Sequence, residues 1–267
     1  MLQVLDRTFS ILDVFDEARP EWNASNIARA LELPVPSVHR ILIALRELGY
    51  VSQDRDTKRF RLGAAALLLG SRARALVEPR TVALEPLRKL SRELRETALL
   101  TGLSADRMAS ICLERVESPE PLRLSVEPGR MLPLHAGASQ KVLLAFMPHE
   151  EAERVLAGRL DRLCRSTFTD KRKLLQELRR IRTRGFATSF EETNAGVWGV
   201  AVPIVSGSEV VCAVGIAGPS ARLDEEILRR ALRRTHGVAL DIAQALGCEV
   251  PPLTPVASAP GPEPLRR

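Results

Sequence analysis

The chain has 267 residues, 39 Lys and Arg against 33 Asp and Glu for a formal charge of +6, and a hydrophobic share of 45%. These values are typical of a folded protein, and the length predicts two compact domains plus a tail. The longest apolar stretches, 64–70 and 196–205, are shorter than the roughly 18 to 20 residues needed to cross a bilayer. The N-terminal residues show no signal-peptide pattern, so we expect a cytoplasmic protein without a membrane segment.

The cysteines are widely spaced and form no C-x-x-C pair. This spacing predicts neither a disulfide framework nor a zinc knuckle, and we expect reduced, mostly buried thiols. A zinc site built from Cys212, His135 or His236 stays open as an alternative, although no spacing favours it. We therefore predict no cofactor. The cysteines are Cys112, Cys164, Cys212 and Cys248.

Residues 1–62 carry the pattern of a small helical domain followed by a hairpin. Apolar spacing predicts a helix over 4–17, a second helix with Ser25 as its N-cap, and a third helix that starts near Ser37 and stops at a glycine. Two short β-prone runs then flank the polar tip 53–58. This order of helices, tight turn and hairpin is typical of a winged helix-turn-helix.

The third helix and the hairpin carry the residues that we expect to touch DNA. In a helix-turn-helix, the second helix of the pair enters the major groove, where Arg40 can bind guanine or clamp a phosphate. The alternative is an ordinary solvated helix face and loop, which the basic hairpin directly after the helix makes less favoured. The expected contacts are Ser37, His39 and Arg40 on the helix and Arg55, Lys58, Arg59 and Arg61 in the hairpin.

The rest of the chain predicts a linker helix over 63–79, a larger domain over 80–247 and a tail over 248–267. Strands cluster before and after a helical middle in the larger domain, which favours an α+β sheet with helices on its faces. Repeated prolines predict a disordered tail. The expected strands are 98–103, 110–116, 123–126, 186–191, 199–205 and 210–217, and the expected helices start at 81, 139, 150, 170 and 224.

From Leu2 to about Gly247 the motifs resemble those of one family, the IclR family of bacterial transcriptional regulators. The matching motifs are Ser37-Val38-His39-Arg40-Ile41-Leu42, Gly49-Tyr50-Val51, Leu132-Pro133-Leu134-His135-Ala136, Lys141, Arg184-Gly185-Phe186-Ala187, Glu191-Glu192 and Ala201-Val202-Pro203-Ile204. The resemblance implies an N-terminal winged helix-turn-helix domain joined by a linker helix to an α/β, GAF-like effector-binding domain. It also implies a homodimer or homotetramer that binds a near-palindromic double-stranded DNA operator, as repressor or activator, and responds to a small-molecule metabolite effector.

The resemblance further implies where the effector binds, between the sheet and the loop that leads into the helix after Leu132-Pro133-Leu134-His135. The unpaired N–H groups at the start of that helix suit a carboxylate. Carried over onto this chain, the effector-binding positions are Leu124, Ala138, Ser139, Gln140, Ser189, Val197, Gly199, Gly215 and Ala217.

The chain departs from the family pattern before the recognition helix. Val35 and Pro36 stand where a basic residue and a serine are common, so a polar contact is missing and an apolar contact to a thymine methyl becomes available. With these departures and the neighbouring motif positions, the expected DNA-binding set also includes Ser25, Val35, Pro36 and Val38.

The chain departs from the pattern in the pocket as well. Gln140 stands before Lys141 where a glycine is usual, and the far wall is small where relatives that bind 2-oxo acids carry acidic, thiol and hydroxyl groups. Gly199, Gly215 and Ala217 thus predict room for a larger acid with an apolar or aromatic body. The alternative is that the glycines only permit close packing within the sheet.

Catalytic interpretations are weaker. Glu191 and Glu192 would be neighbours on a strand and face opposite sides, so they do not make a facing carboxylate pair. His135 and Ser139 lack a G-x-S-x-G nucleophile elbow. Trp198 is expected to be a lid or packing residue, and contact with the effector stays open as the alternative. We predict a regulator that is not an enzyme. Two alternatives stay open, a DNA-tethered enzyme that turns over its ligand and a constitutive DNA-binding protein whose second domain only oligomerises.

Overall fold

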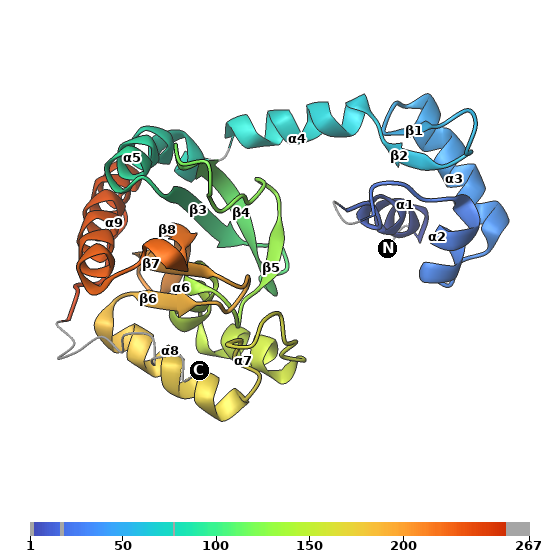
Figure 1. Cartoon of the computed structure of the whole chain (residues 1–267). Coiled ribbons are helices and arrows are strands. Elements are labelled where there is room, and N and C mark those ends of the chain that lie inside the picture. Colours follow the sequence, from blue (N-terminus) through green and yellow to red (C-terminus); the bar gives the residue numbers. More distant parts are fainter. Residues whose placement is uncertain (1–2, 17–18, 77, 255–267) are drawn as a thin grey trace. The chain divides into compact units, whose positions relative to one another are not determined.

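The structure is a computed structural model that describes residues 3–16, 19–76 and 78–254. It divides into two compact units, Met1–Leu76 and Val77–Arg267 (Figure 1). Among the described residues, every helix is too short or too polar to cross a membrane.

The first unit is a helical domain with a two-stranded hairpin. Its elements are α1 (Gln3–Asp13), α2 (Ala24–Ala30), α3 (Val35–Glu47), β1 (Val51–Gln53), β2 (Phe60–Leu62) and α4 (Ala64–Leu76). Pro36 lies in the first turn of α3, where the missing N–H removes no helical hydrogen bond. The predicted N-cap of α2 was wrong, because the Asn23 carboxamide, not Ser25, accepts the Asn26 N–H at 2.8 Å.

Apolar side chains from each part of the first unit meet in one core, which fixes the recognition helix against the hairpin. Ile11, Ile27, Leu42 and Phe60 are each at most 1% exposed and pack in the same cluster. The backbone of Trp22 pairs with Phe60, so the segment before α2 adds a third, very short strand to the hairpin. The sequence pattern gave no sign of this pairing.

The second unit is built on a six-stranded antiparallel sheet in the order β5-β4-β3-β8-β7-β6. Its elements are α5 (Glu78–Leu94), β3 (Thr97–Leu103), β4 (Ala109–Val116), β5 (Met131–Pro133), α6 (Ala138–Phe146), α7 (His149–Ala157), α8 (Lys171–Arg184), β6 (Ala187–Phe190), β7 (Val197–Ser206), β8 (Glu209–Pro219) and α9 (Glu225–Leu246). The expected α+β arrangement is confirmed.

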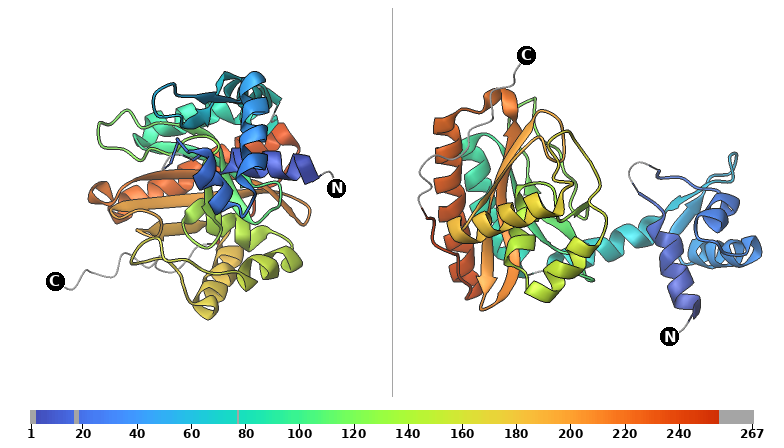
Figure 2. Two further views of the ribbon diagram at one scale, coloured as in Figure 1. Left: turned by 90° about the vertical axis from the view of Figure 1, so that its right-hand side faces the viewer. Right: turned by 90° about the horizontal axis from the view of Figure 1, so that it is seen from below.

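Helices cover both faces of this sheet (Figure 2). One core lies between the sheet and α5 with α9, and a second core lies between the opposite face and α6, α7 and α8. Because both faces are covered, β7 and β8 are buried along almost their whole length rather than at alternate residues. This explains why their sequences are nearly continuous apolar runs.

Two expectations for the second unit were wrong. Residues 123–126 form an extended loop rather than a strand, and the sheet edge is instead β5, which the sequence reading missed. The chain is also ordered beyond Gly247, since Glu249 exchanges two backbone hydrogen bonds of 2.8 Å with Val205 and Leu253 packs on the core. The rest of the predicted tail, 255–267, lies outside the described residues.

Candidate nucleic-acid interface and small-molecule pocket

The start of α3 presents an exposed polar and basic face. Pro36, His39 and Arg40 are exposed and Ser37 is half-buried, while Val35 is 45% exposed at the first helical position. Val38 points the other way and is 0% exposed in the core of the unit. Its inclusion among the DNA-binding residues was therefore wrong, because the helical period turns it away from the exposed face.

The hairpin tip is a basic loop held by one carboxylate. Asp54 Oδ1 accepts the Thr57 N–H at 2.7 Å and the Thr57 hydroxyl at 2.8 Å, and these bonds lower the pKa of Asp54. Lys58 adopts φ +58°, which closes the turn. The predicted cations of the hairpin are all exposed: Arg55, Lys58, Arg59 and Arg61.

A further basic feature next to the hairpin was missed from the sequence. The Arg19 guanidinium stacks 3.7 Å from the centre of the Trp22 ring, and both line a surface hollow with Asn26 and Arg59. Ser25 is exposed within α2 close to this hollow in sequence but does not line it. The signal was tertiary, because the Trp22–Phe60 pairing is what brings Arg19 beside the hairpin.

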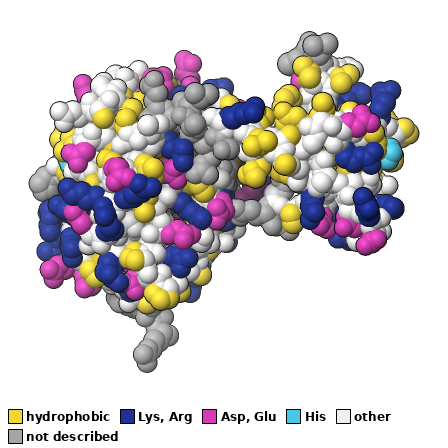
Figure 3. All heavy atoms as spheres, turned by 90° about the horizontal axis from the view of Figure 1, so that it is seen from above, with side chains coloured by type: hydrophobic (Ala, Val, Ile, Leu, Met, Phe, Trp, Pro, Cys, Tyr) yellow, Lys and Arg dark blue, Asp and Glu magenta, His cyan; other side chains and the backbone are white. Residues whose placement is uncertain are grey.

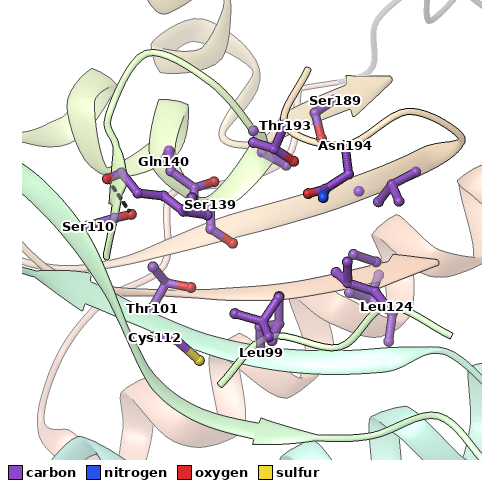
Figure 4. A pocket seen from close by; sticks show the side chains of 18 of the residues that line it. Leu99, Thr101, Ser110, Cys112, Leu124, Ser139, Gln140, Ser189, Thr193 and Asn194 are labelled. Atoms are coloured by element: carbon purple, nitrogen blue, oxygen red, sulfur yellow. Dashed lines mark hydrogen bonds between the residues drawn. The ribbon is translucent and has the colours of Figure 1, made fainter. Parts of the chain in front are cut away.

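The second unit contains a pocket between the start of α6 and the sheet face of β3 and β4 (Figure 4). Its cavity volume is about 60 Å³, and the pocket is open to solvent on one side. Apolar side chains of Leu99, Leu124 and Val126 form one side of the lining, and Leu132 and Val197 add to it.

Almost all the predicted effector positions meet at this pocket, although they lie far apart in sequence. The exception is Gly215, which lies beneath Ser139, since a Cβ at Gly215 would come within 2.7 Å of the Ser139 hydroxyl oxygen. The positions that line the pocket are Leu124, Ala138, Ser139, Gln140, Ser189, Val197, Gly199 and Ala217.

Several buried polar side chains face this pocket without a protein partner. Thr101 is 3% exposed, Ser139 6%, and Gln140 and Ser189 8% each. Within the described ranges of the chain, none of these four side chains has a hydrogen-bond partner. The polar atoms of these four side chains are open to the pocket and not sealed in the core, so a polar molecule or water in the pocket can bind them. Thr193 and Asn194, in the loop after β6, add two more polar groups to the same space (Figure 4).

The sequence predicts a far wall that is small and mostly apolar, and the polar groups that β3 and β4 add to the pocket were not predicted. Gly199 and Ala217 do leave room there, but β3 and β4 also contribute Thr101 and Ser110. The Ser110 hydroxyl donates to the Leu132 carbonyl at 3.0 Å. Thr101 and Ser110 each stand two residues from another pocket-lining residue of the same strand, Leu99 and Cys112, a period-two pattern that could have revealed them.

A buried ion network connects α6 to β6 and the loop after it, next to the pocket. Lys141 is 1% exposed and donates to a Glu192 carboxylate oxygen at 2.6 Å and to the Thr188 carbonyl at 2.9 Å. The other oxygen of Glu192 accepts the Gly137 N–H at 2.9 Å, immediately before α6. Burial raises the pKa of Glu192, and the facing Lys141 opposes that shift.

This network changes the interpretation of the acidic pair. β6 ends at Phe190, so Glu191 and Glu192 lie in the following loop and not on a strand. Glu192 turns inward to Lys141, whereas Glu191 is half-buried with φ +52°. The conclusion that they form no facing carboxylate pair stands, but for a different reason.

Of the other singled-out residues, Trp198 is 1% exposed, packs in the core and also lines the pocket. His135 Nε2 lies 2.9 Å from the Asp161 carbonyl, and burial raises the pKa of the Cys212 thiol to about 12. Among the described residues, His, Cys, Asp and Glu side chains form no group of three or more that could hold a metal ion.

Comparison with known proteins gives a consistent assignment. Residues 4–55 match the IclR helix-turn-helix domain, and residues 76–244 match the bacterial transcriptional regulator IclR C-terminal domain. The chain is 34% identical over 223 residues to the glycerol operon regulatory protein of Streptomyces griseus, covering 83% of this chain and 87% of the relative. It is 30% identical to the HTH-type transcriptional regulator KdgR of Escherichia coli, covering 90% and 91%.

Solved structures agree. A crystal structure of an ICLR transcriptional regulator from Silicibacter sp. superimposes with a TM-score of 0.83 at 26% identity, covering 95% of this chain and 100% of the other. An IclR homolog from Microbacterium hydrocarbonoxydans, crystallised in complex with 4-hydroxybenzoate, gives a TM-score of 0.76 at 28% identity, covering 91% and 99%.

Proposed function

The chain belongs to the IclR family of bacterial transcriptional regulators, and on that premise we propose that it is a ligand-responsive regulator that binds an operator through α3 and a small organic acid through the pocket of the second unit. The observation that carries the proposal is the set of buried, unpartnered polar side chains facing the pocket. Together with the apolar lining of Leu99 and Leu124, these groups form a concave site with a few polar contacts, which is the usual make-up of a small-molecule site.

The exposed face of α3 supports insertion into the major groove of DNA. His39 and Arg40 are exposed near the helix start, where recognition helices touch base edges. Val35 and Pro36 offer an apolar contact beside them. Arg55, Lys58, Arg59 and Arg61 then lie on the phosphate backbone or in the minor groove, where they hold the domain without reading sequence.

Replacing Arg40 with Ala tests this interface. If Arg40 reads a base, the variant loses about 1 to 3 kcal/mol of operator affinity with its salt dependence unchanged, and if it holds a phosphate the salt slope falls by about 1. The measurement is fluorescence anisotropy on a duplex that the full chain selects from a random-sequence pool. Arg92→Ala, an exposed arginine of the second unit, is the matched control. An unchanged binding curve for the Arg40 variant removes that residue from the interface.

The pocket supports a carboxylate effector with a second polar group. The N-terminus of α6 and the hydroxyl of Ser139 suit the carboxylate, Leu99 and Leu124 suit an apolar body, and Thr101 can bind a hydroxyl at the far end. A hydroxylated aromatic acid has these three parts, and a relative crystallised with 4-hydroxybenzoate is consistent with that class.

A thermal-shift screen of benzoates, hydroxybenzoates and short 2-oxo acids tests the effector class. Hydroxybenzoates should raise the melting temperature of the parent and not of a Ser139→Ala variant. Mass spectrometry of the recovered ligand separates a regulator from an enzyme, because a regulator leaves the acid chemically intact. Stabilisation by 2-oxo acids alone would overturn the aromatic assignment.

Exposed apolar side chains on the first unit support association with a second copy of the chain. Val4, Leu5 and Phe9 are 52% to 64% exposed on α1, and Leu67, Leu68 and Leu69 are 54% to 75% exposed on α4. Apolar side chains gather along α4 in Figure 3. Patches of this kind mark interaction sites, and a homodimer would present two recognition helices to half-sites of a palindrome.

Charge in the α1 patch should therefore break the dimer. Phe9→Glu is expected to give monomers in sedimentation experiments and to weaken binding to a two-half-site duplex far more than to a single half-site. The control is Leu240→Glu, because Leu240 is exposed on α9 of the second unit. Phe146→Glu would not serve, because Phe146 packs on a core. A dimeric Phe9→Glu variant would place the interface elsewhere.

Effector and operator would communicate by linkage. An acid that binds one arrangement of the dimer better than another changes operator affinity by the same factor by which the operator changes acid affinity. Titrating the acid with and without operator checks this reciprocity. An operator affinity that no stabilising acid alters would favour the constitutive alternative.

A further inference from the structure

Positive charge is distributed unevenly along this chain. Residues 1–62 carry nine Lys and Arg against nine Asp and Glu, so the winged helix-turn-helix has no net formal charge. Residues 159–184 carry ten Lys and Arg against three Asp and Glu, a formal +7 that exceeds the +6 of the whole chain. The excess charge therefore lies in the second unit, on α8 and the loop before it.

Four of these cations form one face of α8. Arg172, Lys173, Arg179 and Arg180 are exposed, and at 100° per residue they fall within a stripe about 120° wide and about 12 Å long. In the described part of the chain none of the four has an ion-pair partner within 4.0 Å. Figure 2 (right) looks onto this helix on the outside of the second unit.

Nearby acids leave this face positive. Glu177, the one acid within α8, turns inward to Arg184 at 2.8 Å and lies 3.9 Å from Lys141. Glu153 pairs with Lys171 at 3.7 Å, and Asp170 caps the helix through the N–H groups of Arg172 and Lys173. The stripe itself, completed by Gln176 and Thr183, contains no acid.

We propose that this α8 face binds the phosphate backbone of duplex DNA that flanks the operator. The inference rests on the proposed function, because operator binding by the first unit holds the flanking duplex at high local concentration around the second unit. Sequence-independent affinity for DNA comes from neutralised phosphates, and the exposed cations of α8 can add to those that the hairpin supplies. Duplex DNA carries one charge per about 1.7 Å of axis, so a stripe of about 12 Å faces several phosphates.

An acidic protein is the other class of partner that a basic helix could take. The charge distribution favours DNA, since the first unit has no net charge and the long-range attraction of the chain to a polyanion therefore comes from the second unit. The stripe also lacks large apolar side chains among its exposed residues, and protein interfaces centre on such anchors.

The test compares two duplexes and two variants of the full chain. The short duplex is the core selected from a random pool, and the long duplex adds thirty or so unselected base pairs on each side. The test variant replaces Arg172, Lys173, Arg179 and Arg180 with Gln. The control variant replaces Lys89, Arg92, Arg229 and Arg233 with Gln, which removes the same charge from exposed positions of the α5–α9 layer.

The parent should bind the long duplex at least tenfold more tightly than the short one at low salt. The α8 variant should lose that gain, and its slope of log affinity against log salt on the long duplex should fall by about 3 to 4 for four lost phosphate contacts per engaged chain. The control should keep both. Equal melting temperatures of the three proteins show that the substitutions leave the fold intact.

The proposal would be overturned if the α8 variant bound the long duplex with the same affinity and the same salt slope as the parent. If that variant nevertheless lost transcriptional control, the face would be assigned to an acidic protein. Failure of the parent to prefer the selected core over random DNA would instead overturn the proposed function, so the two failures are distinguishable.

Discussion

In the first unit, the residues proposed to bind DNA are exposed side chains of one helix and one hairpin, whereas the pocket of the second unit collects residues from strands, loops and one helix between 99 and 217. The first unit also leaves apolar side chains uncovered. Nine of the fourteen large apolar residues exposed in the described chain lie in it, although it is much the smaller unit. The second unit differs in that polar side chains without a protein partner line its pocket.

The difference shows how each unit depends on something outside itself. Exposed leucines and a phenylalanine are satisfied by another protein surface, and unpartnered hydroxyls by a polar ligand. Substitutions in the two units should therefore affect the unfolding free energy, acid binding and operator affinity to different degrees, and the following variants test this.

The largest effect is expected at the buried ion pair of the second unit. Lys141→Met leaves the Glu192 carboxylate buried without its cation, which should cost about 3 to 5 kcal/mol of unfolding free energy. The chain has two tryptophans, so in a Trp22→Phe background Trp198 fluorescence reports urea unfolding of the second unit alone. The first unit should keep its affinity for a single half-site.

This loss should depend on pH. Burial already raises the pKa of Glu192 above the ordinary value of 4.5, and removing Lys141 takes away the opposing influence. The folded state then binds a proton more tightly than the unfolded state, so unfolding free energy rises as pH falls from 8 toward 4.5. Lys141→Met/Glu192→Gln should lack that rise. A Lys141→Met protein as stable as the parent at every pH would contradict the network.

Filling the space beneath Ser139 should separate ligand response from DNA binding. A Cβ at Gly215 would lie 2.7 Å from the Ser139 hydroxyl oxygen and 3.3 Å from the Val200 carbonyl, so Gly215→Val should cost about 1 to 3 kcal/mol by overpacking. It should also abolish stabilisation by the acid in a thermal-shift assay while operator affinity stays. Gly237→Ala is the control, since nothing lies within 4 Å of its new methyl. Retained acid binding by Gly215→Val would place the ligand away from Ser139.

Two threonines of β3 offer a sharper comparison. Thr101 has no hydrogen-bond partner in the described chain, so Thr101→Val should leave the unfolding free energy unchanged or slightly higher and weaken acid binding about fivefold to tenfold. Thr97 donates to the Leu124 carbonyl at 2.8 Å and accepts the Ser118 N–H at 3.2 Å. Thr97→Val should therefore destabilise the unit by about 1 to 3 kcal/mol. Chemical denaturation and calorimetry of both variants check this, and equal destabilisation would refute the role of Thr101.

The smallest effect is expected at the hairpin tip of the first unit. Asp54→Ala removes the acceptor that orders the loop, and because the loop is exposed, operator affinity should fall only about twofold with the melting temperature unchanged. Asp56→Ala removes an equal charge without that turn contact, and it should strengthen binding slightly through the lost repulsion with phosphate. Anisotropy measurements distinguish them, and identical behaviour of the two variants would show that only charge matters at the tip.

The first unit was largely predictable from the sequence because its main features depend on residues that are close together in the chain. Helical period and glycine stops predict α3, its exposed Arg40 and the hairpin, because these features are local. The prediction that Val38 binds DNA was wrong, because the helical period that exposes His39 turns Val38 into the core. Asn23 outcompeted Ser25 as a cap, which residue type alone does not decide.

The pocket depended on information from outside the sequence pattern. The start of α6 and the small residues of β7 and β8 came from the family resemblance, whereas the polar contribution of Thr101 became visible only when β3 and α6 faced each other. The ion pair between Lys141 and Glu192 joins residues 51 positions apart. No local period encodes such a contact.

The short bridge between Val205 and Glu249 decides where the chain can be cut or fused. The matched family domain ends at residue 244, yet the backbone of Val205 donates to and accepts from Glu249, and Thr254 bonds to the Arg184 and Thr183 carbonyls. A truncation at the matched boundary would strip these partners from the sheet and from the end of α8. A shortened chain therefore has to keep residues 245–254 if these hydrogen bonds are to form.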